Sequence, residues 1–470
     1  MKSLWKTIAF TLALLMLFSC AACGSGAKKA EEEDYEPVED EYVDEDEYVE
    51  EEYQEPEEEE PALEEKPGGT TVIDNRQPSE AGAPAVQTPV SDKPLSDDDF
   101  AVKEYSYESK YGDTTWILAV TNYSDKTVSI SANGTALDAG GNAIGSANMS
   151  IDVLAPNETS VGTYYFNGVT GVENVVSQFS YSTSSWYSPI LSSLSMQQTL
   201  NDKNITVKVT NNSTTCASYT KVYGLFLDAN DKLISYDYSY LTDNDGEIKP
   251  GATFYAQINC NEPYDHTAVY LVSSSNGKTY SDANAIDMSL FEMREYSYDN
   301  SGRYYSVIAV KNNSDKTVEV GGNAGVYDAN GNLIGASNLD DISVLAPGEE
   351  SVGYFYYSNV SGVARQDYSL SVSEETYYRP VIGNLSGNVT LNSKNAVVQV
   401  TNNGPYPAKF VEVFIVFLDS NGNTVDVRSG YLTDNDNEIK PNATLSKQLK
   451  TDKNFDYIMV YYTGRADPEK

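Results

Sequence analysis

Short runs of alternating apolar and polar residues, the pattern of β-strands, recur along the chain from about residue 100 to residue 466. Residues 205–210 alternate strictly, which predicts one face in the core and the other in water: Ile205, Val207 and Val209 against Thr206, Lys208 and Thr210. Residues 116–120 are apolar on both faces, so we expect that strand to be covered on both sides: Trp116, Leu118 and Val120 on one face, Ile117 and Ala119 on the other. No stretch keeps a helical period.

Two turns punctuate these runs, and each of them occurs four times. The first is an Asp that closes an apolar run, followed by Gly- and Asn-rich residues that tolerate the positive φ of a tight hairpin: Asp138, Asp228, Asp328 and Asp419. The second follows 18 to 22 residues later and has the Pro-Gly or Pro-Asn pair of a type II turn: Pro156-Asn157, Pro250-Gly251, Pro347-Gly348 and Pro441-Asn442. Four copies of the same two turns predict four copies of one β module.

The four modules form a duplicated pair. The segment YLTDNDGEIKPGAT at 240–253 returns as YLTDNDNEIKPNAT at 431–444, and EYSY at 104–107 returns at 295–298. An Asn-containing loop lies 16 or 17 residues before each anchoring Asp: Asn122, Asn211, Asn312 and Asn402. The order is therefore A-B-A′-B′. Turn spacing and a module length of about 90 residues predict an all-β fold of four tandem sandwiches, with modules at 99–188, 189–275, 290–379 and 380–466 and a linker at 276–289.

The chain begins with a targeting signal. Lys2 and Lys6 precede an apolar run at 7–18, which has the length of a signal-peptide core and is too short to span a bilayer comfortably. The following LFSCAACGSG at 17–26 resembles the lipobox of bacterial lipoproteins. Cys20 has the expected Leu17 upstream and Cys23 has the expected small residues, so Cys20 is our preferred lipidation site and Cys23 the alternative. An ordinary secretory signal with incidental cysteines is the remaining interpretation. Residues 1–23 are thus expected to be a lipoprotein signal.

The next segment, residues 24–98, is predicted to be a disordered tether. The chain carries 70 acidic and 31 basic residues, and 22 of the net 39 negative charges lie in residues 31–65, leaving 17 for the rest. This acidic tract and the Pro-rich stretch after it have too few apolar groups to offset the entropy of ordering them. A solvated spacer is the simpler interpretation, and an interaction tail for a basic partner is the other. So negative a chain is not expected to bind nucleic acid.

The segment 310–351 carries a family resemblance. Its sequence, VKNNSDKTVEVGGNAGVYDANGNLIGASNLDDISVLAPGEES, has an Asn-Ser loop, a strand ending in Tyr-Asp, a D-x-N-G turn and an L-x-P-G turn. It resembles the FxLYD domain family, although Ala324 stands where that family has Phe. The other three modules share the turns. The resemblance implies immunoglobulin-like modules in an exported lipoprotein of a Gram-positive bacterium, and it implies no activity.

Candidate chemistry is sparse. His266 is the one histidine of the chain, and its counterpart in the second half is Tyr457, so we expect a surface or turn residue rather than a catalytic base. No recognised nucleophile, phosphate-binding or zinc motif occurs. Two acidic clusters offer oxygen ligands for calcium, although the same residues are common in structural turns: Asp243, Asp245 and Glu247, with Asp434, Asp436 and Glu438. The sequence therefore predicts no enzyme and no cofactor, with calcium as an open alternative.

Cysteines and aromatic pairs supply the last candidates. Cys216 and Cys260 follow the signal region, and outside the cell they are expected to form a disulfide, with two free thiols as the alternative. Trp186-Tyr187 and Tyr377-Tyr378 near the A-to-B junctions either stack on a sugar or pack between modules.

Together these features predict a protein held by an N-terminal lipid on the outer face of the cell membrane. Its expected role is non-catalytic binding, adhesion or envelope scaffolding, with an envelope protein or glycan as partner. The alternative is the capture of a glycan or a peptide for sensing or uptake. The ligand itself cannot be identified from the sequence.

Overall fold

A computed structural model describes residues 93–468, except 202, 242–245, 278, 281–285, 300–302, 341 and 433–436. The expected signal, Cys20, Cys23 and nearly all of the expected tether lie outside the described residues. The described chain is all-β and contains only single-turn 3₁₀ segments besides strands: η1 (Asp97–Asp99), η2 (Leu191–Ser193), η4 (Met288–Leu290) and η5 (Ile382–Asn384). Within this part of the chain no helix is long and apolar enough to cross a membrane.

Sandwich A has six strands in two antiparallel sheets, ordered β1-β2-β5 and β4-β3-β6. The strands are β1 (Phe100–Glu108), β2 (Thr114–Asn122), β3 (Val128–Leu137), β4 (Ala143–Leu154), β5 (Thr159–Phe166) and β6 (Asn174–Ser182). Sandwich B repeats the plan with sheets β7-β8-β12 and β10-β9-β13, and β11 extends β9. Its strands are β7 (Leu194–Asn201), β8 (Asn204–Asn211), β9 (Ala217–Leu227), β10 (Leu233–Tyr240), β11 (Glu247–Ile248), β12 (Thr253–Asn259) and β13 (His266–Ser274).

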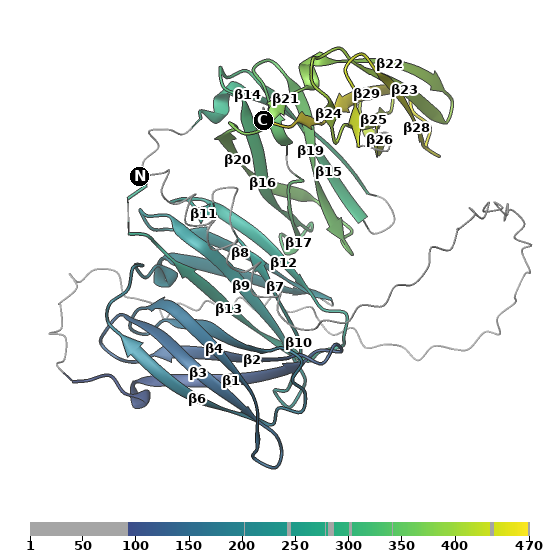
Figure 1. Cartoon of the computed structure of the whole chain (residues 1–470). Helices are drawn as coiled ribbons and strands as arrows, with labels where there is room; N and C mark the ends of the chain where they lie inside the picture. Colours follow the sequence, from purple (N-terminus) through teal and green to yellow (C-terminus); the bar gives the residue numbers. More distant parts are fainter. Residues whose placement is uncertain are drawn as a thin grey trace, which may run out of the picture. The chain divides into compact units, whose positions relative to one another are not determined.

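Sandwiches A′ and B′ repeat this arrangement (Figure 1). The strands of A′ are β14 (Phe291–Asp299), β15 (Arg303–Asn312), β16 (Val318–Tyr327), β17 (Leu333–Asn338), β18 (Ile342–Leu345), β19 (Glu350–Ser358) and β20 (Arg365–Glu374). Those of B′ are β21 (Arg379–Pro380), β22 (Leu385–Asn392), β23 (Asn395–Asn402), β24 (Ala408–Lys409), β25 (Glu412–Leu418), β26 (Thr424–Tyr431), β27 (Glu438–Ile439), β28 (Thr444–Lys450), β29 (Tyr457–Tyr462) and β30 (Arg465–Ala466). In each module the first, second and fifth main strands correspond to the A-B-E sheet of an immunoglobulin sandwich, and the fourth, third and sixth correspond to the C′-C-F sheet. The predicted fold class is therefore confirmed.

Both recurrent turns have the predicted backbone. In the Asp turn one carboxylate oxygen of Asp138 accepts the backbone N–H groups of Gly140 and Asn142, at 2.9 and 2.8 Å. The residue three after each Asp has positive φ: Gly141, Asp231, Gly331 and Gly422. The residue after each Pro of the second turn is also at positive φ: Asn157, Gly251, Gly348 and Asn442. Gly, Asn and Asp stand there because they adopt this conformation at low cost.

A buried asparagine ties the two sheets of each module together. The side-chain N–H groups of Asn122 donate to the carbonyls of Lys126 and Leu154, at 2.8 and 3.0 Å, and its Oδ1 accepts from the backbone N–H of Ser124 at 2.9 Å. The same donation to two carbonyls recurs in every copy: Asn211, Asn312 and Asn402. All four side chains are at most 1 % exposed. Each asparagine thus closes the loop after the second strand onto the strand that precedes the Pro turn.

Sandwiches A and B pack sheet face to sheet face. Ile117 and Ala119 of β2 lie against Leu225 and Leu227 of β9, in an apolar cluster separate from both sandwich cores. The hydroxyls of Tyr105 and Tyr270 hydrogen-bond across this contact at 2.8 Å. The prediction that β2 is covered on both sides is therefore confirmed, and sandwich B provides the second cover.

The A′-B′ contact is a copy of the A-B contact. Val307 and Ala309 pack against Val416 and Leu418, and the hydroxyls of Tyr296 and Tyr461 hydrogen-bond at 2.6 Å. Ser160 Oγ donates to the carbonyl of Leu271 in the first pair, and Ser351 Oγ donates to that of Tyr462 in the second. Since both pairs make the same contacts, the unit that repeats is the pair of sandwiches.

A smaller contact joins B to A′. The amide group of Asn323 hydrogen-bonds both backbone groups of Tyr255, and Thr206 Oγ1 donates to the carbonyl of Leu333 at 2.8 Å. Gly325 lies opposite Tyr255, and a Cβ there would fall 2.5 Å from the tyrosine ring. Thr206 is consequently fully buried. The prediction that the polar face of β8 lies in water is wrong at this residue, because sandwich A′ covers it.

The expected disulfide between Cys216 and Cys260 is not formed, and both residues are buried. Cys216 precedes β9, beside the loop that Asn211 closes, whereas the backbone N–H of Cys260 donates to the carbonyl of Lys203 at the opposite end of β8. The eight residues of β8 hold the two sites about 25 Å apart, far beyond the reach of a disulfide. The prediction is wrong because Cys216 and Cys260, although both lie beside the sheet that contains β8, are at opposite ends of that strand.

Replacement of a buried asparagine should destabilise its sandwich. We expect Asn402→Ala to lower the free energy of unfolding of B′ by about 3 kcal/mol, because it leaves two buried carbonyls and one N–H without partners. Urea unfolding followed by hydrogen exchange of β23 and β28 measures the change. The neighbouring Asn403→Ala, at an exposed position, is the control and should cost below about 0.5 kcal/mol. Equal losses in the two variants would contradict the assigned role.

The Asp turns should lose stability in acid. The side chain of Asn142 and the backbone N–H groups of Asn142 and Gly140 hold the pKa of Asp138 below its ordinary value. Since the pKa of the folded state is lowered, the stabilisation is complete above the pKa of the unfolded chain, near 3.8, and is lost as pH falls through the folded pKa. We expect Asp138→Asn, which keeps the acceptor oxygen, to lower Tm at pH 7 and to match the wild type near pH 2. A difference in Tm that is independent of pH would contradict this.

Candidate functional site

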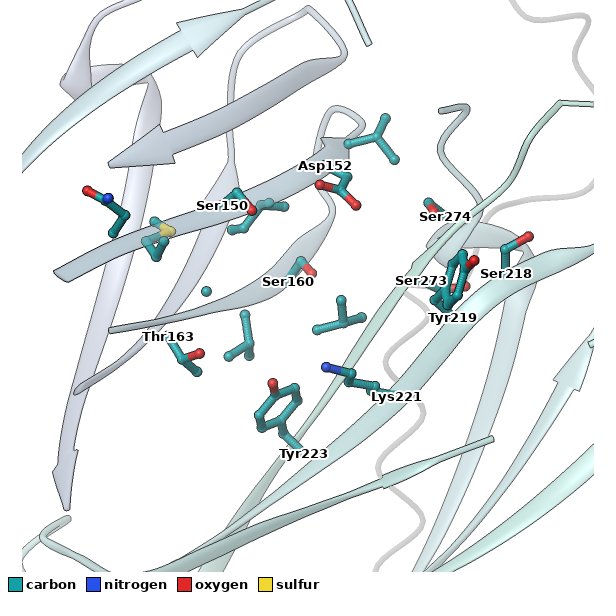
Figure 2. A pocket seen from close by; sticks show the side chains of 17 residues that line it. Ser150, Asp152, Ser160, Thr163, Ser218, Tyr219, Lys221, Tyr223, Ser273 and Ser274 are labelled. Atoms are coloured by element: carbon teal, nitrogen blue, oxygen red, sulfur yellow. The ribbon is translucent and has the colours of Figure 1, made fainter. Parts of the chain in front are cut away.

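A polar cavity of about 370 Å³ lies between the two sandwiches of the first pair. Strands β4 and β5 of A form one wall and strands β9 and β13 of B form the other. Figure 2 shows Ser150, Asp152 and Thr163 on the A side facing Lys221 and Tyr223 on the B side. The volume falls within the range of small-molecule sites. The cavity exists only because the two sandwiches pack against each other, so each wall by itself is an open sheet edge.

Lys221 is the one cationic side chain that lines this cavity. It lies on β9, paired with Tyr240 of β10, and its ammonium group sits 4.8 Å from the Tyr240 ring centre and 5.1 Å from that of Tyr238. Burial acts to lower the pKa of Lys221, but the hydrogen bond to Tyr240 and the neighbouring phenol groups raise the pKa above its ordinary value overall. The ammonium group is therefore charged at neutral pH and is directed into the cavity (Figure 2).

Tyr219, at the rim of the cavity, has an unusual backbone. Its φ is 51°, a left-handed conformation that is rare and costly for a bulky side chain, and its side chain is 67 % exposed. Phe410 occupies the same position in the second pair, with φ of 52°. A strained residue that does not contribute to the core is often retained because of what it contacts from outside. Its place at the cavity rim in both pairs makes this region a candidate functional site.

A second hollow of about 320 Å³ adjoins the cavity at β4 and is lined by β3, β4, β6 and the segment after β6. The two share Ser150, Ile151 and Asp152. Trp186 lines the second hollow and is 98 % exposed, whereas large aromatic side chains are usually mostly buried. Of the two interpretations of the aromatic pair, packing between modules does not hold for Trp186. Its ring is available for stacking on a ligand.

The second pair of sandwiches has a cavity at the same junction, with different charges. It measures about 170 Å³, and Glu412 takes the position of Lys221. Asp340 lines it too, and burial together with the charge of Asp340 raises the pKa of Glu412. Arg465 completes the charged lining, with its guanidinium 3.9 Å from the ring centre of Tyr378. Tyr378 of A′ therefore packs on a residue of B′, as expected for packing between modules, unlike Trp186. The junction recurs, but its electrostatics have changed.

The most voluminous hollow at the A-B junction, about 540 Å³, lies beside the Pro156 turn. Its one charged lining residue is Glu158, which is 7 % exposed. The carboxylate of Glu158 already accepts the backbone N–H groups of Ala155 and Ser192, both at 2.8 Å. This carboxylate fastens the linker between A and B to sandwich A. The hollow thus offers no uncommitted charged group, and we prefer the Lys221 cavity as the candidate site.

His266 lies outside these cavities, at the start of β13. Its Nε2 is 2.8 Å from Asp231 and its Nδ1 is 3.1 Å from Asp265, and the hydrogen bond to Asp265, followed by that to Asp231, raises the pKa of the imidazole. The residue links the Asp228 turn to β13. We assign His266 no catalytic role. That the protein is not an enzyme stays a prediction.

The calcium candidates fall mostly outside the described residues. Only Glu247 on β11 and Glu438 on β27 are described, and Asp243, Asp245, Asp434 and Asp436 are not. Glu247 lies near Ser218, at 3.5 Å from its hydroxyl. Among the described residues no group of three or more acidic, His or Cys side chains could hold a metal ion. Calcium binding stays a prediction, as does lipidation at Cys20 or Cys23.

Sequence reasoning did not find Lys221 or Tyr219. One signal was present: after the two halves are aligned, Lys221 and Glu412 have opposite charge within otherwise similar strands. Positive φ at Tyr219 has no sequence signal, because the residue is neither Gly, Asn nor Asp. The walls of the cavity also come from segments that are separated by more than fifty residues along the chain, so local patterns cannot assemble it.

Comparisons with known proteins add little to this picture. No protein-family model matches the chain, and no curated protein matches it. Among solved structures, Escherichia coli alpha-2-macroglobulin activated by porcine elastase is 8 % identical, with a TM-score of 0.13. The alignment covers 79 % of this chain and 41 % of that protein. No conclusion is drawn from so low a score, and the FxLYD resemblance stays a prediction.

Release of the strain at Tyr219 should stabilise sandwich B. We expect Tyr219→Asn to raise its free energy of unfolding by about 1 kcal/mol, because Asn adopts positive φ at lower cost. Tyr111→Asn, which replaces an exposed tyrosine without positive φ, is the control and should leave stability within about 0.5 kcal/mol. Urea unfolding measures both. A loss of stability in Tyr219→Asn would show that the ring stabilises the fold instead of serving the cavity.

Proposed function

We propose that the chain is a non-catalytic binding protein of the cell exterior, anchored by a lipid on Cys20 or Cys23, and that the A-B junction captures a small polar ligand. The anchor follows from the lipobox-like sequence and the acidic tether. The binding role rests on one observation: the same junction holds a cavity in both pairs, with the packing residues retained and Lys221 exchanged for Glu412.

This pattern is typical of a binding site that has changed its ligand. Interface residues on either side of the cavity, such as the tyrosine pairs 105/270 and 296/461, keep their identity and their hydrogen bond. The lining, by contrast, changes charge at three matched positions, where Lys221, Met149 and Ser274 are replaced by Glu412, Asp340 and Arg465. A change of ligand accounts for new charges in the lining of a retained junction. Adhesion or scaffolding through the outer faces remains a role that the same module array could support.

The lining of the cavity supports capture over catalysis. It contains hydroxyl groups, one ammonium group and one carboxylate, Asp152. No histidine or cysteine lines it, so it offers none of the nucleophile-base pairs on which hydrolases depend. A polar, partly open cavity with exposed aromatic rings at its rim is suited to reversible binding.

A tryptophan introduced into the cavity should abolish ligand binding. Ser150→Trp fills the space between β4 and Lys221, and the control Ser146→Trp places the same side chain on the same strand outside the cavity. Calorimetric titration of the full chain with neutral and acidic oligosaccharides and with acidic and basic hexapeptides measures binding. We expect one class to bind and to lose at least about tenfold in affinity in Ser150→Trp alone. Binding that is equal in both variants would refute the site.

A further inference from the structure

We propose that the ligand of the A-B cavity is an acidic saccharide, with a carboxylate on Lys221 and a sugar ring on Trp186. This inference rests on the proposed function and specifies it. It is carried by three features of two adjoining hollows that share Ser150, Ile151 and Asp152 of β4: a partly buried ammonium group, a set of hydroxyls, and an exposed indole.

The ammonium group of Lys221 is available for an anion. It is flanked by the rings of Tyr238 and Tyr240, and no carboxylate lies within ion-pair distance of it among the described residues. Asp152 belongs to the opposite wall of the cavity (Figure 2). One N–H group of the ammonium is engaged by Tyr240, which leaves two to donate. A ligand carboxylate therefore gains a charge-assisted hydrogen bond while the aromatic rings stabilise the cation.

The hydroxyl groups suit the polar body of a sugar. Six of them line the cavity: Ser150, Ser160, Thr163, Ser218, Ser273 and Ser274. Those of Ser150 and Thr163 have no hydrogen-bond partner within the described part of the chain. Asp152 adds an acceptor for sugar hydroxyls. Such side chains both donate and accept, which a polyhydroxylated ligand requires and an apolar one does not.

Trp186 is held beside the cavity as a platform. The hydroxyl of Ser185 donates to the carbonyl of Asp152 at 2.9 Å, and it accepts the backbone N–H of Tyr187 at 3.1 Å. These two bonds fix the segment that carries the indole against β4, which also lines the cavity. A flat, exposed ring presents an apolar face to the C–H groups of a sugar ring while Lys221 holds the acidic group.

The overall negative charge of the chain does not oppose this assignment. Of the net charge of −39, 22 charges lie in residues 31–65. At physiological ionic strength, charges beyond about 8 Å are largely screened, so the local ammonium group determines the preference of the cavity. The junction of the second pair carries Glu412 and Asp340 in about 170 Å³. Arg465 also lines that junction, so its charged lining is one cation against two carboxylates, whereas the Lys221 cavity has one of each. The smaller and more acidic junction is the poorer site for an acidic sugar, so we infer one site per chain.

The test uses the full chain, trigalacturonate and its methyl ester, in which methyl esters replace the charged carboxylates. Calorimetry gives affinity and stoichiometry, and tryptophan fluorescence, compared with that of Trp186→Ala, gives a second readout. We expect trigalacturonate to bind at one site and the ester to bind at least about tenfold more weakly. Lys221→Met should weaken trigalacturonate to the level of the ester. The control Lys110→Met removes a lysine that also lies over a tyrosine ring, outside the cavity, and should change nothing.

The outcomes separate this inference from the proposed function. If trigalacturonate and its ester bind equally, or if Lys221→Met leaves the affinity unchanged, the acidic-saccharide assignment is overturned. If an acidic hexapeptide binds more tightly than trigalacturonate at the same site, the anion preference stands but the saccharide is wrong. If either of these results is obtained but Ser150→Trp still abolishes binding of some ligand, the proposed binding function stands and only the acidic-saccharide assignment is wrong. Trp186→Ala should lower affinity for the saccharide and leave that for an acidic peptide unaltered.

Discussion

The face-to-face packing of two sandwiches is the interaction on which the rest of the molecule depends. Strand β2 contributes one apolar face to the core of A and the other to the contact with B, so neither sandwich could keep this sequence if it stood alone in water. The contact also sets the distance between β4 and β9, which determines the width of the cavity. Folding and the proposed ligand capture therefore rely on the same buried surface.

Tyrosine accounts for much of the specificity of that contact. The chain contains 37 tyrosines, and several of them bury the ring between sheets while the hydroxyl reaches a partner across the junction, as in Tyr105 with Tyr270. A ring provides the area of a large apolar group, and its hydroxyl requires a matched acceptor. Two sheets that met in another register would leave these hydroxyls unsatisfied, at a cost of about 1 to 3 kcal/mol each. This explains why the second pair retains the arrangement.

The fold could be predicted from the sequence to the extent that it depends on backbone conformation and strand alternation. The turns at Asp138 and Pro156 were predictable because positive φ restricts the residues that can occupy them, and the double cover of β2 followed from its apolar faces. The sequence does not show which module covers a strand face. Thr206 was therefore wrongly predicted to be exposed to water. The disulfide prediction was wrong because the sequence does not tell at which end of the sheet each cysteine lies. Asn122 was recognised as a loop marker, but its burial depends on strands that lie further along the chain.

The contact between B and A′ depends on residues that the outer faces of A and B′ do not have. It depends on a tyrosine, Tyr255, that faces a residue without a side chain, Gly325. On the outer face of B′, Ser446 stands at the position of Tyr255, so the protruding ring is missing. On the outer face of A, Thr135 stands at the position of Gly325, so a side chain fills the space that the ring would need. The outermost surfaces of the array are therefore terminal caps. Separate molecules therefore lack the residue pair that would repeat this contact end to end into a fibre.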